Sequence, residues 1–406
     1  MIPTAPSRSR LLLVHSGMAF DDEPSLYPVP EGLFPSYRPL PLPVQAGVSL
    51  VFAALISAWN QLLSSTHHLR WRRLLWAAIQ WCLLSWTSQF VLRDFLTPPS
   101  RILVDALARD GLLPSTLSHY EAVGDTKVHY LRYQSTDTSS DTVLYLNHGF
   151  GACSLSWLPA LQPLVDRLSC RVGTAHDAPG FGLTARSDDV AAYTLDASAR
   201  LGLHLLPSNV TSVILLGHSM GAITTLEMAR RLDPSVRKRI VLVAPALGLS
   251  RTSRNQKDRK ISKRRSWVDS PSRYILRRLV GQPGFWRRGL SLAWGDAQRL
   301  KDSDVARFQW PSIGEGWEQG LLNFVRAQTL PRQLTDEELV QQVLSLPNTT
   351  LDVVVGSSDR VVPSKKVRKF FESFSSVRIV EMEGLGHDPF EEDVEGFVNV
   401  AAKLLL

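Results

Sequence analysis

The sequence predicts an α/β protein with a mostly parallel sheet that is flanked by helices. From about residue 142 onward, short runs of β-branched residues and Leu alternate with helical patterns, which is typical of strands joined by helical crossovers. One of these runs ends in a Gly-x-Ser-x-Gly motif, and glycine-rich or acidic loops follow several others. With 406 residues, the chain is long enough for one large domain with insertions or for two domains.

The expected elements follow from hydrophobic periodicity and turn signals. Residues 120–133 predict two strands joined at Gly124-Asp125. The further strands are expected at 142–147, 171–175, 212–216, 240–244, 350–355 and 377–382. Helices are expected near 154–168, 188–206, 220–232, 363–374 and 392–405.

The chain divides into five segments by composition. They are a Pro/Ser-rich N-terminal segment (1–43), a hydrophobic helical hairpin (44–96), a first core part (118–246), a basic Trp-rich insertion (247–346) and a second core part (347–406). The apolar run in the first segment is too short for the core of a signal peptide. Whether this segment is a transit peptide is left open.

Residues 44–96 contain two uncharged stretches separated by the basic, aromatic join Arg70-Trp71-Arg72-Arg73. The second stretch, residues 74–92, would be about 28 Å long as a helix, which is close to the thickness of a bilayer core. Basic and aromatic residues are expected at lipid headgroups. The segment therefore predicts a hairpin in or on a membrane. The alternative is a helical extension packed on the catalytic domain, because several polar residues interrupt the second stretch.

The net charge of +7 is concentrated in the insertion, where residues 247–346 contain 18 Lys and Arg against 10 Asp and Glu. No recognised nucleic-acid-binding motif accompanies this charge. Three widely spaced cysteines indicate neither a disulfide framework nor a metal site, and no P-loop or His-Glu-x-x-His motif is present. We therefore expect no metal, no cofactor and no nucleic acid.

The motif Gly217-His218-Ser219-Met220-Gly221 stands between a predicted strand and a predicted helix. Glycines two residues either side of a serine let the strand and the helix approach closely, while the serine occupies a tight, strained turn. This context predicts a nucleophile elbow whose Ser219 hydroxyl projects from the sheet edge, above the helix N-terminus.

Three further motifs follow the carboxyl ends of predicted strands, where an open α/β sheet binds its ligands. His148-Gly149-Phe150-Gly151 and the elbow predict an oxyanion hole made by the amides of Phe150 and Met220. Asp359 lies in a loop that opens onto a helix, and His387 lies in a glycine-rich loop after the last strand.

Ser219, Asp359 and His387 occur in the order nucleophile, acid, base, and the chain thereby resembles the α/β-hydrolase fold family. The resemblance covers residues 118–406 apart from the insertion, and includes the turn at 177–182. It implies acyl transfer to water: Ser219 attacks a carbonyl, His387 moves the proton, and Asp359 orients the imidazole. A serine at the elbow argues against dehalogenases and epoxide hydrolases, which carry aspartate there.

Each candidate has a competing interpretation. Asp359 could cap the following helix, and His387 could be a surface histidine, although no other histidine follows it in the chain. Asp388 is expected to point away from the His387 ring. We interpret His148, His218 and Asp177, which lie in or beside the motifs, as structural rather than catalytic. The reactivity of Cys153, which follows the oxyanion loop, is left open.

The insertion is interpreted as a helical cap over the site, as the resemblance implies. Basic and aromatic residues favour a lid that docks on an anionic membrane surface, with a solvated loop as the alternative. The sequence thus predicts a membrane-associated serine hydrolase of a hydrophobic, lipid-like ester, with the organelle left open. Alternatives are a thioester or carbon–carbon bond hydrolase, a cofactor-free haloperoxidase-like enzyme, and a non-catalytic hydrolase-like binding protein.

Overall fold

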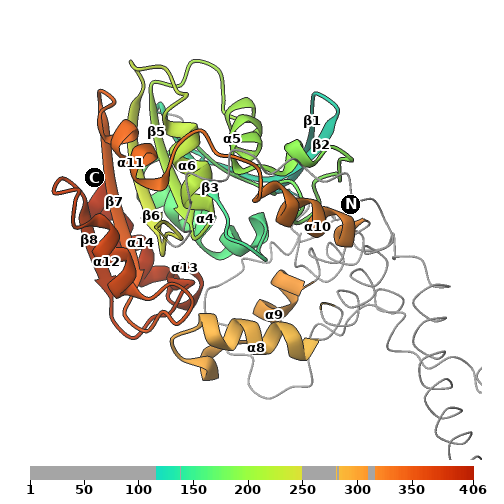
Figure 1. Ribbon diagram of the computed structural model, residues 1–406. Coiled ribbons are helices and arrows are strands. Elements are labelled where there is room, and N and C mark those ends of the chain that lie inside the picture. Colours follow the sequence, from blue (N-terminus) through green and yellow to red (C-terminus); the bar gives the residue numbers. More distant parts are fainter. Residues whose placement is uncertain (1–115, 138, 249–279, 281–282, 310–315) are drawn as a thin grey trace, which may run out of the picture.

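The computed structural model describes residues 116–137, 139–248, 280, 283–309 and 316–406 (Figure 1). The segments at 1–43 and 44–96 and the basic run at 251–265 lie outside these residues, so the membrane hairpin stays a prediction. Within the described ranges, no helix combines the length and the apolar character that crossing a bilayer requires.

Eight strands form one sheet in the order β1-β2-β4-β3-β5-β6-β7-β8. The first three strands in that order pair antiparallel, and all later pairs are parallel. The bounds are β1 Ser118–Val123, β2 Thr126–Gln134, β3 Thr142–Asn147, β4 Val172–His176, β5 Ser212–His218, β6 Arg237–Val243, β7 Thr349–Gly356 and β8 Arg378–Met382. The mostly parallel α/β sheet expected from the sequence is confirmed.

The helices of the core occupy the two faces of this sheet. They are η2 Ser154–Trp157, α4 Leu158–Arg167, η3 Val190–Tyr193, α5 Leu195–His204, α6 Gly221–Ala229, α11 Asp336–Leu344, α12 Ser364–Phe371, α13 Pro389–Glu392 and α14 Val394–Leu405. Helix α4 packs against α14 on one face, and α6 packs against α5 and α11 on the other. Helices α4, α11 and α14 each bury an apolar stripe, as an amphipathic helix must, whereas α6 is buried along its whole length.

Two apolar clusters, one on each side of the sheet, hold the layers together. The first gathers around Trp157 and Phe397 from η2 and α14. The second gathers around Leu226 and Leu339 from α6 and α11. The central strands carry apolar residues on both faces, as a parallel sheet covered by helices requires.

The long insertion runs between β6 and β7. Its described helices α8 (Pro283–Ala293), α9 (Asp302–Gln309) and α10 (Trp317–Ala327), with the turn η5 (Ala297–Arg299), we call the cap. Helices α8 and α9 lie together below the sheet in the view of Figure 1, whereas α10 packs on η3. Helix α11 follows in the insertion but packs against α6 and β7.

Candidate active site

Ser219 occupies the turn between β5 and α6 in a strained conformation. Its φ of 51° lies in the left-handed region, which is uncommon for a residue with a side chain. Its backbone N–H donates to the Val243 carbonyl oxygen at 2.9 Å. This hydrogen bond to the neighbouring strand fixes the turn, so the serine is held at the carboxyl end of the sheet.

The flanking glycines are required by close packing. A Cβ atom at Gly217 would overlap the Thr225 side chain, and one at Gly221 would overlap the carbonyl oxygens of Asn147 and His148. The strand and the helix therefore approach as the motif predicts.

His387 and Asp359 form a buried pair from two adjacent loops. The His387 ring donates through Nδ1 to Asp359 Oδ2 at 2.7 Å. The other carboxylate oxygen accepts from the backbone N–H groups of Val361 and Val362, both at 2.8 Å. Because both oxygens have fixed donors, the carboxylate can hold the imidazole with Nε2 free to accept a proton.

The surroundings of His387 favour its charged form. Burial lowers the pKa of the imidazole, but the hydrogen bond to Asp359 and the charges of Asp388 and Asp359 outweigh burial and raise that pKa above its ordinary value. A base whose protonated form is stabilised in this way is suited to accept a proton from a hydroxyl group.

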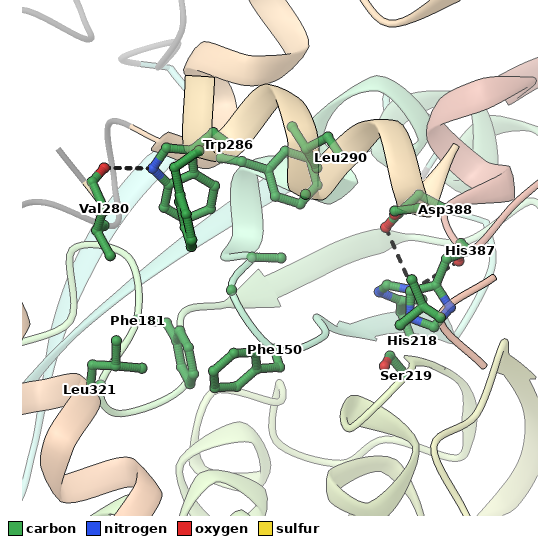
Figure 2. Close-up of a pocket in the computed structure, with 18 of the residues that line it drawn as sticks. Phe150, Phe181, His218, Ser219, Val280, Trp286, Leu290, Leu321, His387 and Asp388 are labelled. Atoms are coloured by element: carbon green, nitrogen blue, oxygen red, sulfur yellow. Dashed lines mark hydrogen bonds and ion pairs between the residues drawn. The ribbon is translucent and has the colours of Figure 1, made fainter. Parts of the chain in front are cut away.

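Ser219 and His387 line the same pocket (Figure 2). Among the described residues, no hydrogen bond joins the serine hydroxyl to the imidazole. Catalytic hydrogen bonds are often long in the absence of substrate. The structure therefore brings the three predicted residues to one end of the sheet, with the Asp359–His387 contact already formed.

The loop that carries Phe150 lies directly beside Ser219. A Cβ atom at Gly149 would be 3.1 Å from Ser219 Cβ, and Met220 precedes the first turn of α6. The backbone N–H groups of Phe150 and Met220 donate to no acceptor among the described residues. Two unused donors beside the serine are the arrangement that an oxyanion hole needs.

The pocket above Ser219 has a volume of about 550 Å³, a size typical of small-molecule sites. Core residues form one wall and the cap forms the other. Its apolar lining includes Phe150, Phe181, Val280, Phe285, Trp286, Leu290, Phe308, Trp317, Leu321, Leu322, Val325 and Val361. Among the described lining residues, His218, His387 and Asp388 are the titratable ones, so the pocket suits an uncharged, hydrophobic ligand.

A model of the alpha/beta hydrolase family matches residues 143–400, which is more than half of the chain. The chain belongs to the alpha/beta hydrolase family. The family indicated by the sequence motifs is thus confirmed, and the protein is a hydrolase.

Related proteins agree with this assignment. The chain is 27% identical over 294 residues to "Putative hydrolase LipZ" of Mycobacterium tuberculosis (strain CDC 1551 / Oshkosh), covering 69% of this chain and 94% of the relative. It resembles a serine hydrolase involved in carbazole degradation (CarC enzyme) with a TM-score of 0.52 at 19% identity, covering 71% and 98% of the two chains. A bromoperoxidase from Bacillus anthracis gives a TM-score of 0.53 at 15% identity, covering 71% and 99%. At these identities the two solved structures support the fold.

Two further histidines of this hydrolase are buried beside the site. His148 donates from Nδ1 to the Gly149 carbonyl oxygen and accepts the Ala178 N–H on Nε2, and burial lowers its pKa. His218 donates to the carbonyl oxygen of His387 at 3.0 Å, and burial holds its pKa well below the ordinary value. Both are therefore neutral groups that fix backbone positions.

Asp177 also has a structural environment. It is buried and accepts hydrogen bonds from the His129 ring and from the backbone N–H groups of Ser154 and Leu183, each at 2.7 Å. Cys153 is buried as well, and burial raises the pKa of its thiol well above the ordinary value. The thiol is therefore held in its unreactive, protonated form.

The cap is attached to the loops that carry Asp359 and His387. Glu392 accepts from the N–H groups of Gly295, in the cap, and Gly386, in the His387 loop, at 2.7 and 2.9 Å. Arg360, next to the acid Asp359, donates to the Trp294 carbonyl oxygen at 2.8 Å. The His387 N–H donates to the Ala293 carbonyl oxygen at the end of α8.

Sequence reasoning did not identify the attachment of the cap or the position of Asp388. Asp388 was expected to point away from the His387 ring; it lines the pocket, with Oδ1 3.5 Å from His218 Nε2. Neither motif spacing nor periodicity reports such contacts between distant segments. Among the described residues, no cluster of His, Cys, Asp and Glu is arranged to hold a metal ion.

Proposed function

We propose that this hydrolase cleaves a hydrophobic carboxylic ester through an acyl-enzyme intermediate. The observation that carries the proposal is the Asp359–His387 pair at the end of an apolar pocket whose floor includes Ser219. Residues that line the pocket provide little that would stabilise a charged substrate. An ester with an apolar acyl chain fits both the chemistry and the lining.

In the proposed reaction, His387 Nε2 takes the proton of Ser219 as the serine oxygen attacks the ester carbonyl. The resulting oxyanion accepts hydrogen bonds from the N–H groups of Phe150 and Met220. Collapse of this tetrahedral intermediate breaks the ester C–O bond, and the imidazolium gives its proton to the departing alcohol. Water, activated by His387, then releases the acid and regenerates the serine. Asp359 keeps the imidazole in the required tautomer throughout.

A fluorophosphonate probe, which labels activated serines, tests the nucleophile. The wild type should be labelled and should hydrolyse p-nitrophenyl esters, with kcat/KM rising along a series of increasing acyl chain length. Ser219→Ala should lose both properties. Ser291→Ala is the matched control, because this half-buried serine lies on α8 and outside the pocket lining; it should behave as the wild type. Labelling of the Ser219→Ala variant would contradict the proposal.

We also propose that the enzyme associates with membranes through residues 44–96 and the basic insertion. The exposed rim of the pocket supports this. Of the exposed large apolar side chains in the described part, four line the pocket: Phe150, Phe285, Val325 and Val361. An apolar rim around a site entrance is typical of surfaces that contact lipid.

Fractionation of the full chain tests the association. We expect it in the membrane pellet after washing with high salt, with release only by detergent. Recovery in the high-salt supernatant without detergent would contradict membrane anchoring by residues 44–96. The ester hydrolysis assay would be unaffected by that outcome.

A further inference from the structure

Asp388 is a buried carboxyl group that makes one long polar contact within the described part of the chain. Its exposed fraction is 3%, and it lines the substrate pocket beside His218 and His387 (Figure 2). Its Oδ1 lies 3.5 Å from His218 Nε2. That N–H is already donated to the His387 carbonyl oxygen at 3.0 Å. Apart from this long contact, the Asp388 carboxyl group accepts no hydrogen bond from the described part of the chain.

The other buried aspartates show how unusual this is. Asp177 and Asp359 each accept from two backbone N–H groups and one histidine. Asp352 accepts from Nε and Nη2 of Arg378, and Asp336 accepts from the Gly248 N–H and from Arg332. Buried polar groups nearly always have partners, and a carboxyl group with so few protein partners in a pocket is suited to bind a group from outside the protein.

The electrostatic environment of Asp388 indicates what kind of partner it can bind. Burial raises the pKa of this carboxyl group to about 6, with His387 lowering it and Asp359 raising it. Near neutrality the group thus exists in both its ionised and its protonated forms. The carboxylate accepts a hydrogen bond and the acid donates one. A hydroxyl group can serve as partner to both forms, because it is donor and acceptor at once.

The position of Asp388 indicates which part of the substrate reaches it. It follows His387, whose imidazole returns a proton to the departing alcohol in the proposed reaction, and the rings of His218 and His387 are 4.7 Å apart. The apolar residues Phe181, Trp286 and Leu321 lie toward the other end of the pocket (Figure 2). A polar group of the substrate at Asp388 therefore lies near the scissile bond, on the alcohol side.

We propose that Asp388 is a specificity-determining residue that binds a free hydroxyl group on the alcohol part of the ester. The preferred substrate then joins a long apolar acyl chain to a hydroxylated alcohol of the glycerol type. This inference rests on the proposed ester hydrolysis, and it adds the class of alcohol.

Two esters of the same acid test the inference: 1-lauroylglycerol and propyl laurate. Both have a twelve-carbon acyl chain and a three-carbon alcohol, and they differ only in the free hydroxyl groups. The wild type should show a kcat/KM about 10 to 100 times higher for the glycerol ester, as expected for a hydrogen bond to a buried charged group. Asp388→Leu should reduce this ratio to near one. Asp388→Asn, which keeps hydrogen-bonding atoms, should give an intermediate ratio.

Asp393→Asn is the matched control, because Asp393 caps α14 and is not among the lining residues; it should keep the wild-type ratio. A wild type that hydrolyses both esters equally well would overturn the inference. So would an Asp388→Leu variant that loses activity on both esters by the same factor, since that indicates a structural role. If Asp388→Leu does not fold, the ratio measured for Asp388→Asn decides. Hydrolysis of neither ester by the wild type would instead count against the proposed function.

Discussion

The two walls of the pocket are built in different ways. On the core wall, backbone groups fix the polar atoms: the Ser219 turn is tied to β6, and the Asp359 carboxylate is held by two N–H groups. The cap wall presents apolar side chains such as Trp286 and Leu321. Where the cap meets the loops of Asp359 and His387, it contributes the carbonyl oxygens of Ala293 and Trp294 and the N–H group of Gly295.

This difference separates two tasks. Under the proposed function, Ser219, Asp359 and His387 on the core wall fix the geometry of bond breaking, in which small displacements are costly. We expect the cap wall to select the substrate by apolar contact area, which tolerates gradual change. Changes to Ser219, Asp359 or His387 on the core wall should therefore affect the hydrolysis of all esters, whereas changes on the cap wall should affect esters according to their acyl chain.

The largest effect is expected for Asp359→Asn. An amide cannot accept the His387 Nδ1–H and the two backbone N–H groups with the same charge and geometry, so the imidazole would adopt the wrong tautomer. We expect kcat/KM to fall by about 10⁴-fold for short and long esters alike. The measurement is steady-state hydrolysis across a chain-length series. A loss restricted to long esters would contradict the assignment of this residue to bond breaking.

Gly386→Ala should have the next largest effect, because it disturbs the contact between the two walls. A Cβ atom there would overlap the Ala293 carbonyl oxygen and the Gly295 backbone, so the His387 loop must shift. A displacement of this kind should reduce kcat by about 10²-fold and lower the free energy of unfolding by about 1–3 kcal/mol. Denaturant titration and hydrolysis assays measure the two quantities.

Gly284→Ala provides the control on the cap side. This glycine lies in the first turn of α8, and a Cβ atom there would meet no other atom within 4 Å. Activity should be unchanged and stability should change by less than about 1 kcal/mol. Equal losses in the Gly386→Ala and Gly284→Ala variants would show that the close contact with the His387 loop is not what matters.

Leu321→Ala should have a smaller, selective effect. Leu321 lies on α10 and lines the pocket, so its removal takes apolar contact area from a long acyl chain. We expect kcat/KM to fall by about 10-fold or more for twelve-carbon esters, with little change for acetate esters. A uniform loss across the series would contradict the assignment of the cap wall to chain selection.

The smallest predicted effect is a displacement of the pH profile. His387 must be neutral to take the proton from Ser219, and its pKa is raised above the ordinary value of 6.5. The loss of kcat/KM on acidification should therefore have its midpoint above pH 6.5. A midpoint below pH 6.5 would show that the carboxylates near His387 do not outweigh its burial.

The core wall could be predicted from the sequence because its signals are local. Strand β3 has the predicted bounds, and the other strands agree within a few residues. The elbow glycines and the loops of Asp359 and His387 follow strand ends directly, so the order of the chain already indicates that they meet. The contact between Asp359 and His387 was predicted on that basis and is present.

The cap wall could not be predicted in the same detail. Helix α8 has an amphipathic pattern, but the pattern does not report that its last carbonyls accept from the His387 loop and from Arg360. The role of Glu392 depends on two N–H groups that are far apart in the chain, at Gly295 and Gly386. The burial of Asp388 likewise depends on how the loops pack against one another, which the sequence does not show.

The hydrogen bond from the His387 N–H to Ala293 has a consequence for protein engineering. It joins a residue of the predicted triad to a helix of the insertion, so the two cannot be treated as interchangeable modules. A chimera that carries a cap from another hydrolase would need a carbonyl oxygen at the same point and room for Gly386. Without them, the transplanted cap would alter turnover as well as substrate range.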